Sequence, residues 1–144
     1  MNKMSGAEKM ALLMCSNFKK YEPIVACGGE SLKKAFDDKG IDTYALSFCK
    51  KDLLKTLKDL KALIKEKNIE ILHCHDNTAS LYGYMLKKIY MLDVKVISHI
   101  HNCYPWIKAG GINKKIDGIF RPKYDFNITC GRRVYDFYDK YAPY

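Results

Sequence analysis

The chain alternates between short apolar runs and longer stretches with helical periodicity, and this alternation restricts its fold more than any other feature. The apolar runs are rich in β-branched or aromatic residues and are bounded by turn residues, which is typical of strands. Five strands are expected, at residues 23–27, 43–48, 69–73, 94–98 and 125–130. Helical patterns lie between them, at residues 7–18, 32–40, 53–64 and 77–91. Strands and helices in this order predict an α/β fold with a Rossmann-like, mainly parallel sheet and helices on both faces.

The length of the chain favours a single domain. Its 144 residues, 48% of them hydrophobic, can build one core but hardly two, so we predict one domain over residues 1–144. A doubly wound domain reaches its first helix from a central strand, and only residues 1–4 precede the helix that begins near Ser5. The first strand is therefore expected to be missing, which would leave a gap in the sheet and marginal stability.

Charge and cysteine content restrict the partners and the compartment. The net charge of +9 favours an anionic partner such as a phosphorylated metabolite, an acidic membrane surface or nucleic acid, although a solvated basic face explains the lysines equally well. The six cysteines are scattered and no secretory signal precedes them, which favours a reducing cytoplasm. No apolar stretch approaches the roughly 18 residues of a membrane span, so any membrane contact is expected to be peripheral.

All four histidines lie in two H-x-H pairs at the carboxyl ends of predicted strands, where open parallel sheets bind ligands. His75 and His101 are the candidate functional residues, because a neutral imidazole both donates and accepts a hydrogen bond. His73 and His99 point to the same side but deeper, where packing is the expected role. Asp76 could position His75, bind a substrate hydroxyl or cap the helix that follows.

A transition-metal site is the alternative interpretation of the four histidines. Two imidazoles on the same strand face point in similar directions and need help from a carboxylate or a cysteine to complete a closed shell. Cys74 lies between His73 and His75 but projects to the other face. We therefore expect no metal site.

The first helix offers a second candidate site. Ser5 can cap its free amides while Glu8 closes a capping box. The amides of Gly6 and Ala7, together with the helix dipole, suit a diphosphate. The alternative is that Ser5 and Glu8 merely cap the helix well.

Residues 103–123 combine aromatic and basic side chains around Gly110 and Gly111. This mixture suits the surface of an anionic membrane. A loop that folds its aromatic side chains onto the core explains the same residues equally well.

Five segments in order along the chain carry the motifs of one known family. They are S-G-A-E-K-M-A-L-L-M at 5–14, G-G-E-S-L-K-K-A-F-D-D-K-G-I-D-T-Y-A-L at 28–46, I-E-I-L-H-C-H-D-N-T-A-S-L-Y-G-Y at 69–84, V-I-S-H-I-H-N at 96–102 and D-F-N-I-T-C-G-R-R-V-Y-D-F-Y at 125–138. Through these segments the chain resembles the amino-terminal, acceptor-side domain of retaining glycosyltransferases of family 4, which have the GT-B fold of two Rossmann-like halves.

The resemblance implies transfer of a sugar from a nucleotide sugar to a glycan or lipid-linked acceptor, in the synthesis of a surface polysaccharide or glycolipid. The donor-binding half is absent from these 144 residues, so this chain alone is expected to be inactive. His75 and His101 would be the catalytic residues. Ser5, Gly6, Ala7, Asp76, Asn77 and Asn102 would bind the substrates. No cofactor and no nucleic acid are expected, and the protein would be cytoplasmic, with the inner face of the membrane as a candidate location.

Two other functions stay open. The chain could be a non-catalytic half-enzyme that docks on a separate donor-binding chain. It could also be a small flavodoxin-like or nucleotide-binding module that uses Ser5 and Gly6 for phosphate. The absence of a G-x-G-x-x-G motif and of a Walker lysine argues against the second alternative.

Overall fold

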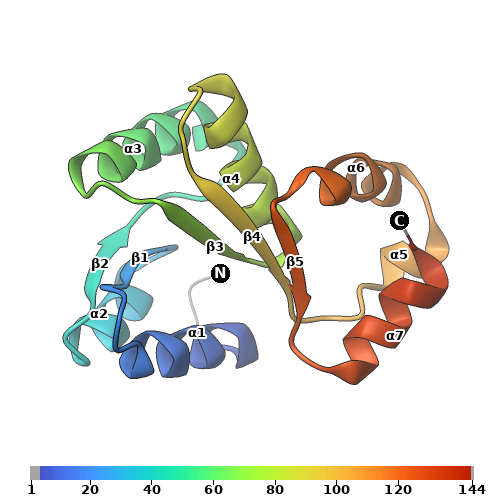
Figure 1. Cartoon of the computed structure of the whole chain (residues 1–144), viewed down its shortest axis with the longest axis horizontal. Helices are drawn as coiled ribbons and strands as arrows, with labels where there is room; N and C mark the ends of the chain where they lie inside the picture. The colour runs from blue at the N-terminus through green and yellow to red at the C-terminus, as the bar shows by residue number, and fades with distance from the viewer. Residues whose placement is uncertain (1–3, 144) are drawn as a thin grey trace. The chain divides into compact units, whose positions relative to one another are not determined.

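The computed structural model describes residues 4–143 of the chain. The chain forms two compact units, Met1–Leu63 and Ile64–Tyr144 (Figure 1). Both units are built from parallel strands flanked by helices, so the predicted α/β, Rossmann-like fold is confirmed. No helix within residues 4–143 combines the length and the apolar character needed to cross a membrane.

The first unit contains two parallel strands and the first helices. Its elements are α1 (Gly6–Asn17), β1 (Ile24–Cys27), α2 (Glu30–Asp37), β2 (Asp42–Ala45), the 3-10 helix η1 (Lys50–Asp52) and most of α3 (Leu53–Glu66). Strands β1 and β2 pair with Ile24 opposite Asp42. Helix α2 packs on β2 and buries Leu32 and Phe36, which form the core of this unit together with Leu57.

The second unit contains three parallel strands in the order β3-β4-β5. Its elements are β3 (Ile71–His75), α4 (Asp76–Ile89), β4 (Lys95–Ile100), α5 (Pro105–Ala109), α6 (Ile112–Phe120), the 3-10 helix η2 (Arg121–Lys123), β5 (Phe126–Thr129) and α7 (Arg132–Tyr141). Each parallel pair is joined through at least one helix, as parallel strands require.

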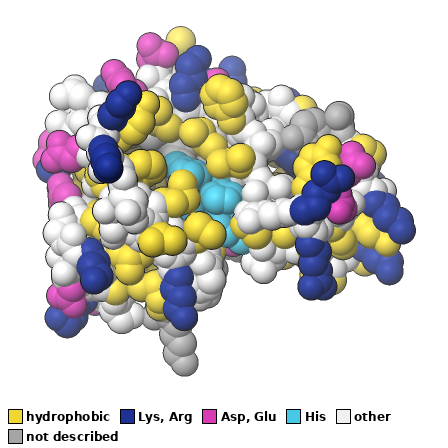
Figure 2. Space-filling model, turned by 60° about the horizontal axis from the view of Figure 1, so that its bottom comes forward, with side chains coloured by type: hydrophobic (Ala, Val, Ile, Leu, Met, Phe, Trp, Pro, Cys, Tyr) yellow, Lys and Arg dark blue, Asp and Glu magenta, His cyan; other side chains and the backbone are white. Residues whose placement is uncertain are grey.

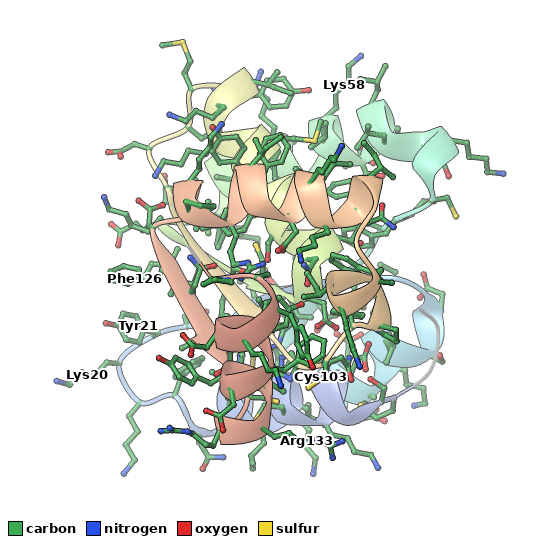
Figure 3. The ribbon with its side chains drawn as sticks, turned by 90° about the vertical axis from the view of Figure 1, so that its right-hand side faces the viewer. Lys20, Tyr21, Lys58, Cys103, Phe126 and Arg133 are labelled. Atoms are coloured by element: carbon green, nitrogen blue, oxygen red, sulfur yellow. The ribbon has the colours of Figure 1, made fainter. Side chains whose placement is uncertain are left out.

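The two faces of the β3-β4-β5 sheet differ in character. Helix α4 packs on one face, where Ser80 Oγ donates a hydrogen bond to Ser98 Oγ over 2.8 Å. The opposite face carries the histidines and exposed apolar side chains, among them Phe126, which is 62% exposed and projects outward from β5 (Figure 3). The sheet of this unit therefore has one face buried beneath α4 and one face that combines imidazoles with apolar side chains.

Gly83 lets α4 approach the sheet closely. A Cβ atom at this position would lie 2.8 Å from Cys74 Sγ and 3.2 Å from Val96 Cγ1. We expect Gly83→Ala to lower the free energy of unfolding by about 1–3 kcal/mol, because the added methyl group overpacks this contact. Urea unfolding monitored by circular dichroism measures the effect.

Gly118 provides the matched control for this substitution. It lies within α6, and nothing stands within 4 Å of the Cβ that alanine would add. Gly118→Ala should be neutral or stabilising by up to about 1 kcal/mol, since alanine has the higher helix propensity. Equal effects of the two substitutions would contradict the argument from close packing.

Residues 103–123 fold mainly as α5, α6 and η2. Of the two interpretations of this segment, the one that placed its aromatic side chains on the core is therefore confirmed in the packing but wrong in describing the segment as a loop. Ile107 is fully buried in a cluster with Ile100, Val134 and Tyr138, and Trp106 packs against this cluster. The aromatic part of the segment thus contributes to the core of the second unit. Pro105 begins α5 at its first position and Gly110 ends it, which are the positions that helices prefer for these residues.

The five strands and four long helices lie close to their predicted positions, and the expected break in the sheet is confirmed. The strands form one sheet of two and one of three, β1-β2 and β3-β4-β5. The clearest shift is in β3, which covers Ile71–His75 in place of residues 69–73, so that His75 belongs to the strand itself. The strand predicted to be missing would precede α1, and residues 1–3 of that segment lie outside the described residues.

Candidate functional site

The parallel pairing of β3 and β4 brings the four histidines together on one face of the sheet. His75 lies directly opposite His99 in the register of the two strands. His73 Nε2 is 3.1 Å from His99 Nδ1, and His75 Nδ1 is 2.8 Å from His101 Nε2. Each contact joins an Nε2 to an Nδ1, so a hydrogen bond between neutral rings requires both rings of a pair to be the same tautomer, with the hydrogen on Nε2 in both or on Nδ1 in both.

The four rings pack against one another in one cluster, in which some pairs are stacked and others tilted. Ring centroids are 4.7 Å apart for His73 and His75, 5.2 Å for His75 and His99, and 4.2 Å for His99 and His101. His99 is only 7% exposed, as expected for the deeper pair, whereas His73 is half-buried like His75 and His101. The prediction that His73 is deeper than its neighbour was wrong, because both rings stand side by side on the same face.

Burial holds the imidazoles in their neutral form. It lowers the pKa of His75 to about 3, and the neighbouring histidines lower it further. The same causes, burial first, lower the pKa of His99 to about 4 and also lower that of His73. Near neutral pH these rings act as hydrogen-bond donors and acceptors and not as cations.

Asp76 connects the two strand ends. Its Oδ1 accepts a hydrogen bond from the backbone N–H of His101 over 3.2 Å. Helix α4 begins at Asp76 itself, with His75 at the N-cap, so Asp76 does not cap the helix. Its φ of 71° lies in the left-handed region of backbone conformation, which residues other than glycine, asparagine and aspartate rarely adopt. The turn therefore directs the carboxylate toward β4.

Asn77 is held on the far side of this turn by a buried charge pair. Its Nδ2 donates to Asp117 Oδ1 over 2.7 Å, and Asp117 also forms an ion pair with Arg121 that is almost fully buried. Arg121 Nη1 in turn donates to the carbonyl oxygen of Ala142 over 2.8 Å. This network was not predicted from the sequence. The i,i+4 spacing of Asp117 and Arg121, which allows an ion pair on a helix, was the signal that could have indicated it.

Asn102 follows β4 and is exposed. Its side chain hydrogen-bonds with Tyr104, which also interacts with Asp76. Burial is the main cause that raises the pKa of Tyr104 to about 12, so its phenol stays protonated. Tyr104 thus interacts with two of the predicted site residues, Asp76 and Asn102, although the sequence placed it only in a membrane-binding or core segment.

The start of α1 has the predicted capping box. Ser5 N donates to Glu8 Oε2 over 2.9 Å, and the Ser5 side chain is also bonded to this carboxylate. Burial raises the pKa of Glu8, but the hydrogen bonds from Ser5 and the backbone outweigh it and lower the pKa overall. Ser5 and Gly6 are exposed and Ala7 is buried. The Glu8 carboxylate already serves as an anion at this helix end.

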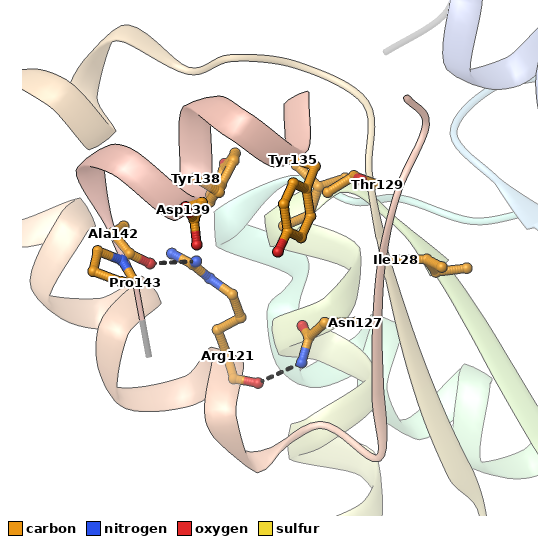
Figure 4. A pocket seen from close by; sticks show the side chains of 10 residues that line it. Arg121, Asn127, Ile128, Thr129, Tyr135, Tyr138, Asp139, Ala142 and Pro143 are labelled. Carbon is orange, nitrogen blue, oxygen red and sulfur yellow. Dashed lines mark hydrogen bonds between the residues drawn. The ribbon is translucent and has the colours of Figure 1, made fainter. Parts of the chain in front are cut away.

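A separate pocket of about 300 Å³ lies between β5, η2 and α7 (Figure 4). Arg121, Asn127 and Tyr138 contribute polar groups to its lining. Asn127 Nδ2 donates to the backbone oxygen of Arg121 over 3.0 Å. None of the sequence-predicted site residues lines this pocket.

A sequence model described as Glycosyltransferase Family 4 matches residues 4–142, nearly the whole chain. The chain belongs to glycosyltransferase family 4. This membership confirms the resemblance seen in the sequence motifs and places the chain among glycosyltransferase domains. Comparisons with curated proteins and with solved structures found no match.

The structure brings some of the predicted site residues of this family 4 domain together and leaves others apart. His75, His101 and Asp76 form one hydrogen-bonded group at the carboxyl ends of β3 and β4. Asn77 and Asn102 come directly after this group in the chain but bond to other partners. The remaining predicted residues, Ser5, Gly6 and Ala7, belong to the first unit of the family 4 domain.

Proposed function

We propose that the chain is the acceptor-binding half of a retaining glycosyltransferase with the GT-B fold. The whole enzyme would transfer a sugar from a nucleotide sugar to a glycan or lipid-linked acceptor, in the synthesis of a surface polysaccharide or glycolipid. The observation that carries this proposal is the hydrogen-bonded pair of His75 and His101 at the carboxyl ends of two parallel strands of a family 4 domain. The donor-binding half would act from the same polypeptide or from a separate one.

The chemistry of the histidine group suits an acceptor sugar. Neutral imidazoles and the Asp76 carboxylate can bind hydroxyl groups, which both donate and accept hydrogen bonds. His75 and His101 would orient the acceptor, and Asp76, Asn77 and Asn102 would contact it or the rings that hold it. No cofactor other than the nucleotide sugar is required by this role.

The amino terminus of α1 is proposed to bind the diphosphate of the nucleotide sugar. The backbone at Gly6 is accessible, since nothing lies within 4 Å of the Cβ that another residue would place there. The amides of Gly6 and Ala7 and the helix dipole would attract the phosphates, while the Glu8 carboxylate would have to leave room for them.

Helix α6 supports contact with an anionic membrane at the cytoplasmic face. Ile112, Ile116 and Ile119 are all exposed and recur at helical spacing, so they form an apolar stripe. Lys115 lies beside this stripe and can approach lipid phosphates. A lipid-linked acceptor would be reached from such a position.

Binding of acceptors by the complete 144-residue chain tests the proposed function. We expect the chain to bind one class of oligosaccharide or lipid-linked sugar on a glycan array. His75→Gln and His101→Gln should each weaken binding by about tenfold or more, since one hydrogen bond in a desolvated site is worth about 1–3 kcal/mol. Isothermal titration calorimetry measures the change in affinity.

Asn113→Ala is the control, because Asn113 is exposed on α6 and lies outside the histidine group. It should leave the affinity for the sugar unchanged. Equal affinity of the wild-type chain and both histidine variants would overturn the assignment of the acceptor site. Binding of nucleotides without binding of any glycan would instead favour the nucleotide-binding alternative.

A separate observation favours the alternative of a half-enzyme that docks on another chain. Ile71, Phe126 and Ile128 are 44%, 62% and 41% exposed on the histidine face of the β3-β4-β5 sheet. Apolar residues gathered on one sheet face are typical of an interface. If sugar transfer arises only when a separately produced donor-binding half of the family is added, the chain works as such a subunit.

A further inference from the structure

Three of the four histidines place their ring nitrogens around one point. One nitrogen from each of His73, His75 and His99 lies within 4.8 Å of the other two. The closest measured pair, His73 Nε2 and His99 Nδ1, is separated by 3.1 Å. Two nitrogens that bind one tetrahedral zinc ion at about 2.0–2.1 Å lie about 3.3 Å apart. This pair of rings therefore has the spacing of two ligands of one ion, and a bound ion would replace their hydrogen bond, with the hydrogen moved to the other nitrogen of its ring.

The trio draws its ligands from two strands, so the number of imidazoles does not depend on one strand face alone. His73 and His75 come from one strand and their rings are stacked at 20°, so alone they would approach an ion from similar directions. His99 comes from β4, opposite His75 in the register, and its ring is inclined by 38° to that of His75 and by 18° to that of His73. The three side chains would therefore rotate to direct their nitrogens at one ion. Neither a carboxylate nor Cys74 is then needed for a three-ligand site.

We propose that His73, His75 and His99 form a binding site for one divalent late transition-metal ion, with zinc as its occupant. Imidazole ligands suit zinc, copper and nickel, whereas magnesium and calcium require oxygen ligands that this trio does not offer. Three histidines leave the fourth position of a tetrahedral ion open to water or another small ligand, as in zinc sites that are not purely structural.

The surroundings of the trio fit this role. His101 Nε2 lies 2.8 Å from His75 Nδ1, so His101 can hold the His75 ring in place while the other nitrogen faces the ion. His73 and His75 are only half-buried, and Figure 2 shows histidine side chains at the surface of the molecule. An ion can therefore reach the site from solvent.

This inference goes beyond the proposed function, since it concerns binding of a metal and not of a sugar. Its failure would leave the assignment of His75 and His101 to the acceptor intact, whereas a bound ion would occupy the second nitrogen of His75 and leave the acceptor to His101 and the open position of the ion. Conversely, a chain that binds zinc but no glycan would refute the proposed function alone.

Zinc binding by the metal-free, 144-residue chain tests the site. Equilibrium dialysis with zinc chloride should show one ion per chain, and His73→Gln combined with His99→Gln should weaken binding by at least about a hundredfold. The six free cysteines are competing ligands, and Cys49 and Cys130 are the exposed ones. Cys49→Ser combined with Cys130→Ser is therefore the control, and it should retain the full affinity.

Zinc X-ray absorption on the wild-type chain gives a result that does not depend on the folding of any variant. We expect a first shell of nitrogen or oxygen at about 2.0–2.1 Å and no sulfur shell at about 2.3 Å. A sulfur shell, or loss of zinc in the cysteine variant, would assign the ion to the thiols and overturn the proposal. Absence of bound zinc in the wild-type chain would overturn it as well.

Discussion

Asp117→Ala is expected to lower the free energy of unfolding of the second unit by about 3–5 kcal/mol, because it leaves a buried charge without its partner. The side chains of Arg121 and Asp117 are only 3% and 6% exposed. Asp117 also accepts the hydrogen bond from Asn77 Nδ2, so one substitution removes both interactions. Urea unfolding followed by tyrosine fluorescence and circular dichroism measures the loss.

The chain contains a matched control for this prediction. Arg132 and Asp136 form another i,i+4 pair of the same residue types, but their side chains are 84% and 56% exposed. Asp136→Ala should change stability by less than about 1 kcal/mol, since solvent screens an exposed pair. If both substitutions cost the same, burial does not govern the strength of the Asp117 pair.

Acidification from pH 7 to pH 5 is expected to destabilise the second unit by about 2–4 kcal/mol. The pKa values of His75 and His99 are lowered to about 3 and about 4 in the folded chain, from an unfolded value of 6.5. Below pH 6.5 the unfolded chain therefore binds protons that the folded chain does not, and stability falls as the pH falls. The loss begins near pH 6.5 and continues down to the folded pKa values of about 4 for His99 and about 3 for His75. Thermal melts in buffers that contain a metal chelator measure it.

Between pH 7 and pH 5 the loss of stability comes from the histidines and not from the carboxylates. The pKa values of Glu8 and Asp125 are lowered from 4.5 and 3.8, so the stability that these groups supply is lost only at lower pH. Facing the two imidazoles are the rings of His73 and His101. The double substitution of His75 and His99 by Gln should flatten the profile between pH 7 and pH 5. An equally steep profile in this variant would show that other groups cause the acid sensitivity.

Most of the fold could be predicted from the sequence, because hydrophobic periodicity and turn residues agree along most of the chain. The segment around α5 and α6 could not, since these helices are short and Gly110 and Gly111 interrupt the apolar pattern between them. The boundary signals were nevertheless present, with proline at the start of α5 and glycine at its end. Short helices are defined by such caps more than by periodicity.

The candidate site could be predicted only in part. Alternation along a strand shows that His73 and His75 share one face, as do His99 and His101. Which residue of β3 lies opposite which residue of β4 depends on the register, and the crossover through α4 sets this register in three dimensions. The three-nitrogen cluster is a product of that register. The burial of Asp117 was equally invisible, because most charge pairs at its spacing are exposed.

The turn at Asp76 restricts the evolution of this surface in two independent ways. Its backbone, at a φ of 71°, excludes β-branched and bulky residues, while the N–H of His101 needs an acceptor from the side chain. Glycine meets only the first requirement and glutamate only the second, so aspartate and asparagine alone meet both. The position therefore has almost no neutral substitutions open to it, whether or not the neighbouring histidines change.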